Sequence, residues 1–250
     1  MIAIIPARYE SSRFEGKPLA AIMGKPMIQW VYERVTQTRP VLSDVIVATD
    51  DDRIVAAVKT FGGHAMLTSS KNRSGTDRVA EAAEKAGAHM DDIVINIQGD
   101  QPLLHPDCIN DLTTPFFTEP GLEMATLAYR TTDKSEIENP KDVKVTFDMN
   151  GYALYFSRSP IPFSRNPGLE FDTHKHLGFY AYTRRFLEMF RSLPEGILER
   201  VEKLEQLRAL EYGHRIKVVV TPHDSPEVDL PQDIQRVEKM ISEQKSATGE

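Results

Sequence analysis

Three continuous apolar runs constrain the fold of this 250-residue chain more than any other feature. The runs occupy residues 2–5, 45–48 and 93–97, the last of which contains one polar residue, Asn96. Stretches with helical spacing of apolar residues follow them, or lie between them, at residues 27–35, 52–61 and 77–86. Runs of Val and Ile without polar alternation are typical of strands that are buried on both faces, and strands that alternate with helices form βαβ units. We therefore predict an α/β fold around a mostly parallel, Rossmann-like sheet.

The pattern changes after about residue 120. Strand-like segments then follow one another with little helix between them, at residues 123–129, 143–147, 152–156 and 177–183. Such a succession predicts antiparallel strands. We expect a single domain over residues 1–250 with a smaller antiparallel insertion at about residues 123–183. A helix at 203–212, a strand at 216–220 and a helix that starts at Pro231 complete the prediction.

Composition excludes several classes of protein. Apolar residues make up 40% of the chain, which is enough for a large core, and Cys108 is the only cysteine, so no intrachain disulfide forms. The net charge of −7 disfavours nucleic acid as a partner. The sequence contains no stretch of about 18 apolar residues and no signal-like segment, so we expect a cytoplasmic protein without membrane association.

A cationic loop follows the first strand. Pro6 ends that strand, and Arg8, Arg13 and Lys17 come next, interleaved with glycine and proline. Ligands of open α/β sheets bind at the carboxyl ends of the strands, so three cations there favour a bound triphosphate over a solvated basic loop. The chain has no GxxxxGK[ST] run, which disfavours a P-loop kinase or ATPase.

Two aspartates are candidate ligands of Mg²⁺. Asp100 follows the strand at 93–97 beside Gly99, and Asp229 follows the last strand. Mg²⁺ prefers a few carboxylates together with phosphate oxygens and water. Asp229 also precedes a helix, where aspartate is favoured for capping alone, so the residues by themselves leave both interpretations open.

The start of the helix near residue 77 also allows two interpretations. Ser74, Gly75 and Thr76 offer free N–H groups to an anion or a base edge, with Arg78 one turn further on, or they simply cap the helix. The consecutive acids at 50–52 resemble a metal-binding DxD, but capping and complementation of the helix dipole explain them better.

Two further pairs of polar residues stand out in the second half. Glu205 and Gln206 lie on an amphipathic helix and are either site residues or its solvated face. His174 and His176 have the spacing of two ligands on one face of a strand, but no third ligand is evident nearby, so no zinc site is predicted.

Seven motifs cover nearly the whole chain in order: PARYESSRFEGKP, SGTDR, INIQGDQP, YALYFSR, HLGFYAY, KLEQLRALEYG and VDLPQDI. Together they resemble the bacterial 3-deoxy-manno-octulosonate (Kdo) cytidylyltransferases, also called CMP-Kdo synthetases. The resemblance implies a single α/β nucleotidyltransferase domain with a GT-A-like sheet and a dimerising insertion. It also implies a homodimeric enzyme that uses CTP and Mg²⁺ to make CMP-Kdo for lipopolysaccharide synthesis.

The resemblance further implies roles for individual residues. It assigns the triphosphate of CTP to Arg8, Arg13 and Lys17, and Mg²⁺ to Asp100 and Asp229. It assigns the base and ribose to Ala7, Gln98, Ser74, Gly75, Thr76 and Arg78. It assigns the acid sugar to His176, Tyr180, Glu205 and Gln206, with Arg158 as a weaker candidate. Catalysis then depends on Arg13, Lys17, Asp100 and Asp229.

Four positions depart from the family pattern. Glu15 stands where Pro is common, Asp77 and Gln101 stand where Glu is frequent, and Leu230 stands where Thr is usual. None of these changes removes a phosphate-binding cation or a metal carboxylate, so we expect activity. The SGTDR and GDQP variants are closer to a subgroup that prefers an 8-amino derivative of Kdo, which leaves the substituent at C8 open.

The predicted reaction is in-line attack of the anomeric hydroxyl of Kdo on the α-phosphate of CTP, with release of pyrophosphate. Positioning and charge neutralisation dominate such transfers, and the sequence offers no strong general base. The alternatives are a nucleotidyltransferase for another acid sugar or a sugar phosphate, and a non-catalytic nucleotide or sugar sensor. Burial of Tyr155, Phe156 and Ile161 across a twofold axis would form the dimer interface, although these side chains also fit the core of one subunit.

Overall fold

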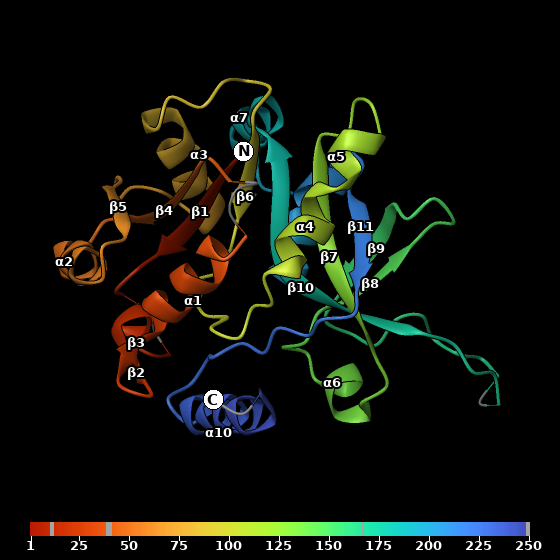
Figure 1. Ribbon diagram of the computed structural model, residues 1–250. Helices are drawn as coiled ribbons and strands as arrows, with labels where there is room; N and C mark the ends of the chain where they lie inside the picture. The colour runs from red at the N-terminus through yellow and green to blue at the C-terminus, as the bar shows by residue number, and fades with distance from the viewer. Residues whose placement is uncertain (11–12, 39–41, 167, 249–250) are drawn as a thin grey trace.

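A single mixed sheet forms the centre of the protein (Figure 1). The computed structural model describes residues 1–10, 13–38, 42–166 and 168–248. Within these ranges the main path of the sheet runs β11–β7–β10–β6–β1–β4–β5. Its strands are β1 Ile2–Ala7, β4 Asp44–Thr49, β5 His64–Leu67, β6 Ile93–Asn96, β7 Met124–Thr131, β10 Thr173–Thr183 and β11 Lys217–Thr221.

The strand directions confirm the prediction of a mostly parallel sheet. β1 pairs in parallel with β4 and β6, β4 pairs in parallel with β5, and β11 pairs in parallel with β7. β10 alone runs the other way along this path, because it pairs antiparallel with both β6 and β7. The carboxyl ends of the remaining strands therefore meet at one edge of the sheet.

The region of the predicted insertion contributes to the main sheet at both of its ends. β7 and β10 lie in the middle of the sheet, whereas β8 Lys144–Phe147 and β9 Ala153–Ser157 form an antiparallel pair beside it. The segment between β9 and β10 extends away from the body of the molecule (Figure 1). The division into one domain with an insertion at about 123–183 stays a prediction.

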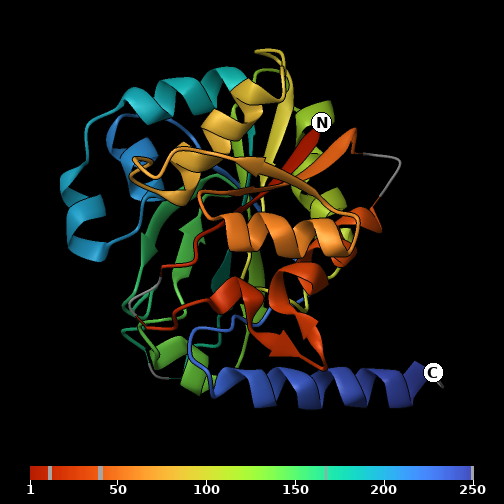
Figure 2. The same cartoon turned by 90° about the vertical axis from the view of Figure 1, so that its left-hand side faces the viewer.

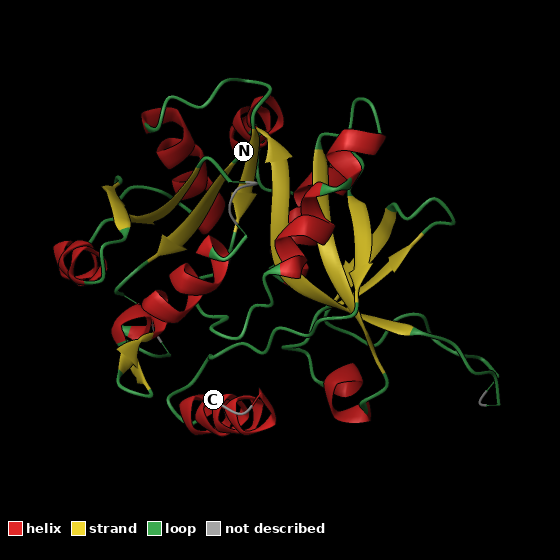
Figure 3. Ribbon diagram, viewed as in Figure 1, coloured by secondary structure: helices red, strands yellow, loops and turns green. Residues whose placement is uncertain are grey.

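Helices cover both faces of the sheet (Figure 3). They are α1 Met27–Thr36, α2 Asp52–Thr60, α3 Gly75–Lys85, α4 Asp107–Thr113, α5 Pro115–Thr118, α6 Lys134–Glu138, α7 Arg184–Ser192, α8 Ile197–Glu202, α9 Gln206–Glu211 and α10 Asp233–Thr248, with a 3₁₀ turn η1 at Lys17–Leu19. Helices were correctly predicted at α1, α2 and α3. The predicted helix at 203–212 was wrong at its start, because Lys203 adopts a left-handed conformation with φ of 53° and separates α8 from α9.

The sheet has an apolar core on each face because helices pack against both faces. Alternate residues of β1 serve the two cores: Ile4 packs in the cluster that includes Val79 of α3, and Ile5 packs in the cluster that includes Val31 of α1. Phe156 is fully buried in the first cluster, which favours the core of one subunit over the dimer interface, the two interpretations that the sequence left open. None of the helices in the described ranges combines the length and the apolar character that a membrane span requires.

The C-terminal helix closes one end of the molecule. α10 packs against the short hairpin of β2 Ala21–Ile22 and β3 Lys25–Pro26, and it runs along the lower edge of the body in Figure 2. Val237 and Ile241 of this helix join Ile22 and Val228 in a third apolar cluster. Burial of Val228 fixes the backbone beside Asp229, so this packing positions one of the predicted metal ligands.

Candidate active site

A cleft of about 680 Å³ opens beside the ends of β6 and β10. Its lining combines residues from distant parts of the sequence, including Arg13, Gly75, Thr76, Asn96, Gln98, Asp100, Arg158, Lys175, His176, Tyr180, Glu205, Gln206, Glu227 and Asp229. Most of the predicted site residues therefore share one cavity, although the motifs that carry them span more than 200 residues.

A cation and two carboxylates converge at one end of this cleft. Lys17 Nζ lies 2.6 Å from Asp100 Oδ2 and 3.6 Å from Asp229 Oδ1. Arg13 Nη1 lies 3.0 Å from the other oxygen of Asp229. The Val228 N–H donates to the Asp100 carbonyl at 2.9 Å, which ties the two acidic segments together. The structure thus brings together the four residues that we predicted to act in catalysis.

The turn before Lys17 depends on a glycine. Gly16 has a φ of +69°, a left-handed conformation that favours glycine, and a Cβ there would lie 3.1 Å from the Tyr9 ring. Its N–H donates to the Tyr9 carbonyl at 2.9 Å and closes the loop. This local geometry directs Lys17 back toward Asp100.

Glu227 belongs to the same cluster and was not predicted from the sequence. Its Oε1 accepts a 3.2 Å hydrogen bond from Nε2 of buried Gln101. Desolvation in the cleft, followed by the negative charges of Asp100 and Asp229, raises the pKa of Glu227 to about 8. The signal for this residue was its position two residues before Asp229, which places both side chains on one side of an extended segment.

The chemistry of these donors fits a hard divalent cation. Asp100 and Asp229 supply carboxylate oxygens that already point at one positive charge, that of Lys17. Desolvation contributes most to the raised pKa of Glu227, and the negative charges of Asp100 and Asp229 add to it. A bound cation would neutralise these two charges.

The raised pKa of Glu227 leads to a prediction about stability. Because its folded pKa of about 8 exceeds the ordinary value of 4.5, the folded chain keeps a proton that the unfolded chain has lost. The contribution of Glu227 to the free energy of unfolding should therefore fall as the pH rises from 4.5 to about 8. The free energy of unfolding, measured with urea at several pH values in this range, should fall less steeply with pH for Glu227→Gln than for wild type. The control Glu138→Gln, on the surface of α6, should retain the wild-type dependence on pH.

Two hydroxyl groups at the start of α3 bind a carboxylate in the middle of the cleft. Ser74 Oγ donates to Glu205 Oε1 at 2.8 Å, and Thr76 Oγ1 donates to Glu205 Oε2 at 2.5 Å. Ser74 also caps α3 by accepting from the Asp77 N–H at 3.1 Å, which confirms the capping interpretation. Nucleotide binding by this turn stays a prediction. Burial raises the pKa of Glu205.

His176, Tyr180 and Gln206 are buried in the wall of the cleft. The Thr126 hydroxyl donates to the Phe179 carbonyl at 2.6 Å, so it accepts from His176 Nε2 at 2.9 Å and leaves Nδ1 as an acceptor. Burial lowers the pKa of His176 to about 3, so the ring is neutral at ordinary pH. Gln206 Nε2 is buried without a hydrogen-bond partner in the part of the chain that the structure describes.

Five of the predicted nucleotide residues are not among those that line the cleft: Ala7, Arg8, Lys17, Ser74 and Arg78. Arg78 is fully buried, with Nη2 at 2.9 Å from Asp50 Oδ2 and Nη1 donating to Thr68 Oγ1 at 2.6 Å. Arg8 is exposed and donates to the Asn72 carbonyl at 2.9 Å. The preference for capping among the acids at 50–52 is confirmed for Asp51, which accepts from the Arg53 N–H at 2.9 Å.

The other predicted residues have defined positions. Ala7 ends β1 and is buried, and Gln98 lines the cleft and donates to the Gly178 carbonyl at 3.0 Å. Arg158 also lines the cleft, but its guanidinium already donates to the carbonyls of Glu202 at 2.6 Å and Pro140 at 2.9 Å. These contacts explain how Arg158 is held and leave its role in ligand binding a prediction.

Known proteins are similar in sequence to this chain over most of its length. A 3-deoxy-manno-octulosonate cytidylyltransferase from Desulfosudis oleivorans is 61% identical over 240 residues, which cover 96% of each chain. An 8-amino-3,8-dideoxy-manno-octulosonate cytidylyltransferase from Shewanella amazonensis is 56% identical over 239 residues, which cover 95% of this chain and 97% of the relative.

The fold is shared as well. A solved structure of CMP:2-keto-3-deoxy-manno-octonic acid synthetase complexed with CTP has a TM-score of 0.91 and 42% identity, over 97% of this chain and 98% of the other. The family model described as cytidylyltransferase matches residues 2–216. Because this match spans most of the chain and the relatives are similar over nearly their full lengths, the chain belongs to the cytidylyltransferase family.

Proposed function

We propose that this cytidylyltransferase transfers the cytidylyl group of CTP to an eight-carbon acid sugar, Kdo or its 8-amino derivative, for lipopolysaccharide synthesis. The observation that carries the proposal is the arrangement of one cleft. Lys17, Arg13, Asp100 and Asp229 converge at one end, and Glu205, Gln206, His176 and Tyr180 line the remainder. The names of the similar proteins support both sugars.

The nucleotide binds where the cations follow β1. Arg13 and Lys17 contact the triphosphate of CTP, with Arg8 on the exposed side of the loop. The start of α3 at Gly75 and Thr76, together with Gln98 and Ala7, receives the ribose and base. Ser74 and Arg78 support this turn, since Ser74 caps α3 and Arg78 anchors its first turn to Asp50. CTP binding draws Lys17 from the carboxylates toward the phosphates.

Asp100 and Asp229 are the residues that would hold Mg²⁺. The ion, when bound, neutralises phosphate charge and lowers the pKa of the attacking hydroxyl. Release of Lys17 from the two carboxylates leaves their oxygens free for such an ion.

The reaction joins two substrates without a covalent enzyme intermediate. The anomeric oxygen of the sugar forms a bond to the α-phosphorus, the bond from that phosphorus to the bridging oxygen breaks, and pyrophosphate leaves with its electron pair. The hydroxyl proton passes to solvent or to pyrophosphate. Lys17 and Arg13 stabilise the charge on the phosphates, which is the main contribution a protein makes to such transfers.

The proposed sugar contacts give a prediction that distinguishes binding of the sugar from binding of CTP. Gln206→Leu removes an unpartnered buried amide, and loss of a hydrogen bond to a charged or polyhydroxyl ligand costs about 10- to 100-fold in affinity. We expect the KM for the sugar to rise by about that factor while the KM for CTP stays unchanged. Steady-state kinetics would check this, with exposed Gln235→Leu of α10 as the control. An equal rise in both KM values would contradict a sugar-specific role.

Pyrophosphate release tests the function directly. Wild-type protein should release pyrophosphate from CTP with Mg²⁺ only when Kdo or 8-amino-Kdo is present. The ratio of kcat/KM for the two sugars identifies the preferred substrate. Release with neither sugar, combined with tight CTP binding, would instead favour a nucleotide sensor.

We also expect a homodimer in the cytoplasm. Leu154 of β9 is 63% exposed and Phe163 of the following segment is 88% exposed, which supports an interface on this side of the subunit. Tyr155 and Ile161 are half-buried neighbours of these residues. Light scattering should give about twice the subunit mass of 28.2 kDa.

A further inference from the structure

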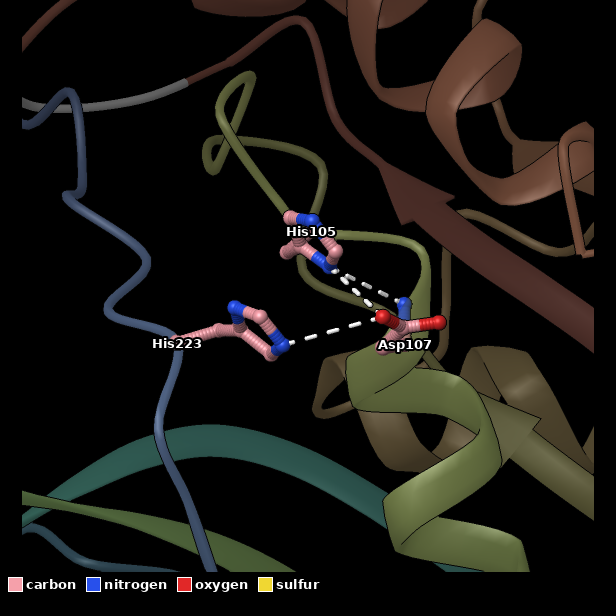
Figure 4. A group of neighbouring side chains, drawn as sticks. All are labelled: His105, Asp107 and His223. Atoms are coloured by element: carbon pink, nitrogen blue, oxygen red, sulfur yellow. Dashed lines mark hydrogen bonds and ion pairs between the residues drawn. The ribbon is translucent and has the colours of Figure 1, made fainter.

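A group of side chains that offers potential metal ligands is drawn in Figure 4, and none of its members is among the residues that line the cleft. His105 and Asp107 stand at the start of α4, and His223 follows β11. His105 Nδ1 lies 3.6 Å from Asp107 Oδ2, and His223 Nε2 lies 3.8 Å from the same oxygen. One donor atom from each of the three residues lies within 4.8 Å of the other two. Both rings thus direct a nitrogen toward one carboxylate.

The protein holds these residues in place through nearby contacts. The Thr221 hydroxyl donates to Asp111 Oδ2 at 2.7 Å and ties the end of β11 to α4. The two imidazole rings stack with centroids 3.7 Å apart and planes 5° apart. His105 Nδ1 accepts a 3.2 Å hydrogen bond from the Asp107 N–H, and a bound ion would take the place of this hydrogen bond.

We infer that His105, Asp107 and His223 form a binding site for a divalent transition-metal ion such as Zn²⁺, with water completing the coordination. Two imidazole nitrogens and one carboxylate oxygen match the ligands that Zn²⁺ takes in open sites. Mg²⁺ prefers oxygen ligands alone, so this site and the carboxylates at Asp100 and Asp229 select different ions.

The site needs only a small rearrangement to bind an ion. Tetrahedral ligands at about 2.1 Å from Zn²⁺ are separated by roughly 3.4 Å, which is a few tenths of an ångström below the two nitrogen–oxygen separations of 3.6 Å and 3.8 Å. The nitrogen lone pairs of two parallel stacked rings point in parallel planes and do not meet at one point. Binding of an ion by both rings therefore requires the rings to tilt toward each other. The side chains of His105 and His223 are 45% and 29% exposed, which leaves room for that rotation.

The position of the site gives binding a consequence for the protein. His105 lies shortly after Asp100 in the chain, and His223 lies shortly before Asp229. An ion held by both histidines would therefore link the two segments that carry these aspartates. We expect it to raise the melting temperature by resisting separation of α4 from the end of β11.

Calorimetric titration of Zn²⁺ into the full chain, in saturating Mg²⁺, tests the inference. One ion should bind per chain, and His223→Asn should weaken binding at least about tenfold. The control is His64→Asn, because His64 also pairs with one aspartate, through Nδ1 at 2.8 Å from Asp44 Oδ2, and its loss should leave binding unchanged. Asp229→Asn should also leave binding unchanged if the ion avoids the cleft.

Two further measurements strengthen the test. Co²⁺ in place of Zn²⁺ should give an absorption band that wild-type protein shows and His223→Asn lacks. Zn²⁺ should raise the melting temperature of wild-type protein but not of His223→Asn. Equal Zn²⁺ affinity in wild-type and His223→Asn proteins, or loss of binding in Asp229→Asn, would overturn the inference.

Discussion

Replacement of Lys17 by methionine is expected to lower kcat by about 10³-fold or more while the chain still folds. Methionine keeps much of the apolar length of the side chain but removes the only ammonium group that contacts both Asp100 and Asp229 among the described residues. A cation on the transferring phosphate stabilises the transition state more than the ground state, so the loss should appear in kcat rather than only in KM. Single-turnover kinetics with saturating CTP and sugar would measure it.

The ligand-free Lys17→Met protein supplies an independent readout. Without the ammonium group, the charges of Asp100 and Asp229 repel each other without compensation, so melting should occur at a lower temperature. Mg²⁺ should recover more stability in this variant than in wild type, because it replaces the missing charge. Lys59→Met, at an exposed position near the end of α2, controls for general loss of a cation. Turnover within a few-fold of wild type would contradict the phosphate-binding role.

Local patterns predicted the parallel half of the fold but not the strand order of the other half. The runs that became β1, β4 and β6 are continuous because helices cover both faces, and that pattern is visible in the sequence. The reversed direction of β10 depends on pairing with β6, from which it is separated by more than 70 residues. Periodicity carries no information about such long-range pairing, so this part of the sheet was predicted only as an antiparallel insertion.

The same distinction applies to the cleft. Lys17 and Asp100 were identifiable because each follows the end of a buried strand. The partnership of Glu205 with Ser74 and Thr76 joins segments about 130 residues apart, and only the fold reveals it. His105 and His223 are likewise far apart in sequence, so the stacked pair gave no local signal.

Arg78 and Gln101 show how burial changes the meaning of a motif. The charge of Arg78 suggested a ligand, yet its guanidinium is enclosed and paired with Asp50. Gln101 stands where the family frequently has Glu, and its amide donates to Glu227. A glutamate there would place another carboxylate beside Glu227, so the amide reduces the repulsion in this crowded acidic cluster.

Replacement of Asp100 by asparagine should lower kcat/KM by about 10²- to 10³-fold at limiting Mg²⁺, with partial recovery as Mg²⁺ is raised. Asparagine preserves the size of the side chain and one oxygen, but it removes the charge that attracts a divalent cation and pairs with Lys17. Measurement of the rate as a function of Mg²⁺ should therefore show a higher concentration for half-maximal activity. Asp52→Asn, on the exposed first turn of α2, removes the same charge elsewhere and should match wild type.

The Asp100→Asn variant also has a consequence that does not depend on activity. The negative charge of Asp100 helps raise the pKa of Glu227, so its removal should bring that pKa down from about 8 toward the ordinary value of 4.5. The fall in unfolding free energy attributed to Glu227 should then end at a lower pH in urea titrations. Full activity at limiting Mg²⁺ together with a lowered Glu227 pKa would show that Asp100 shapes the electrostatics of the cleft without binding the ion. Loss of activity with the same pKa change would be the result expected of a metal ligand.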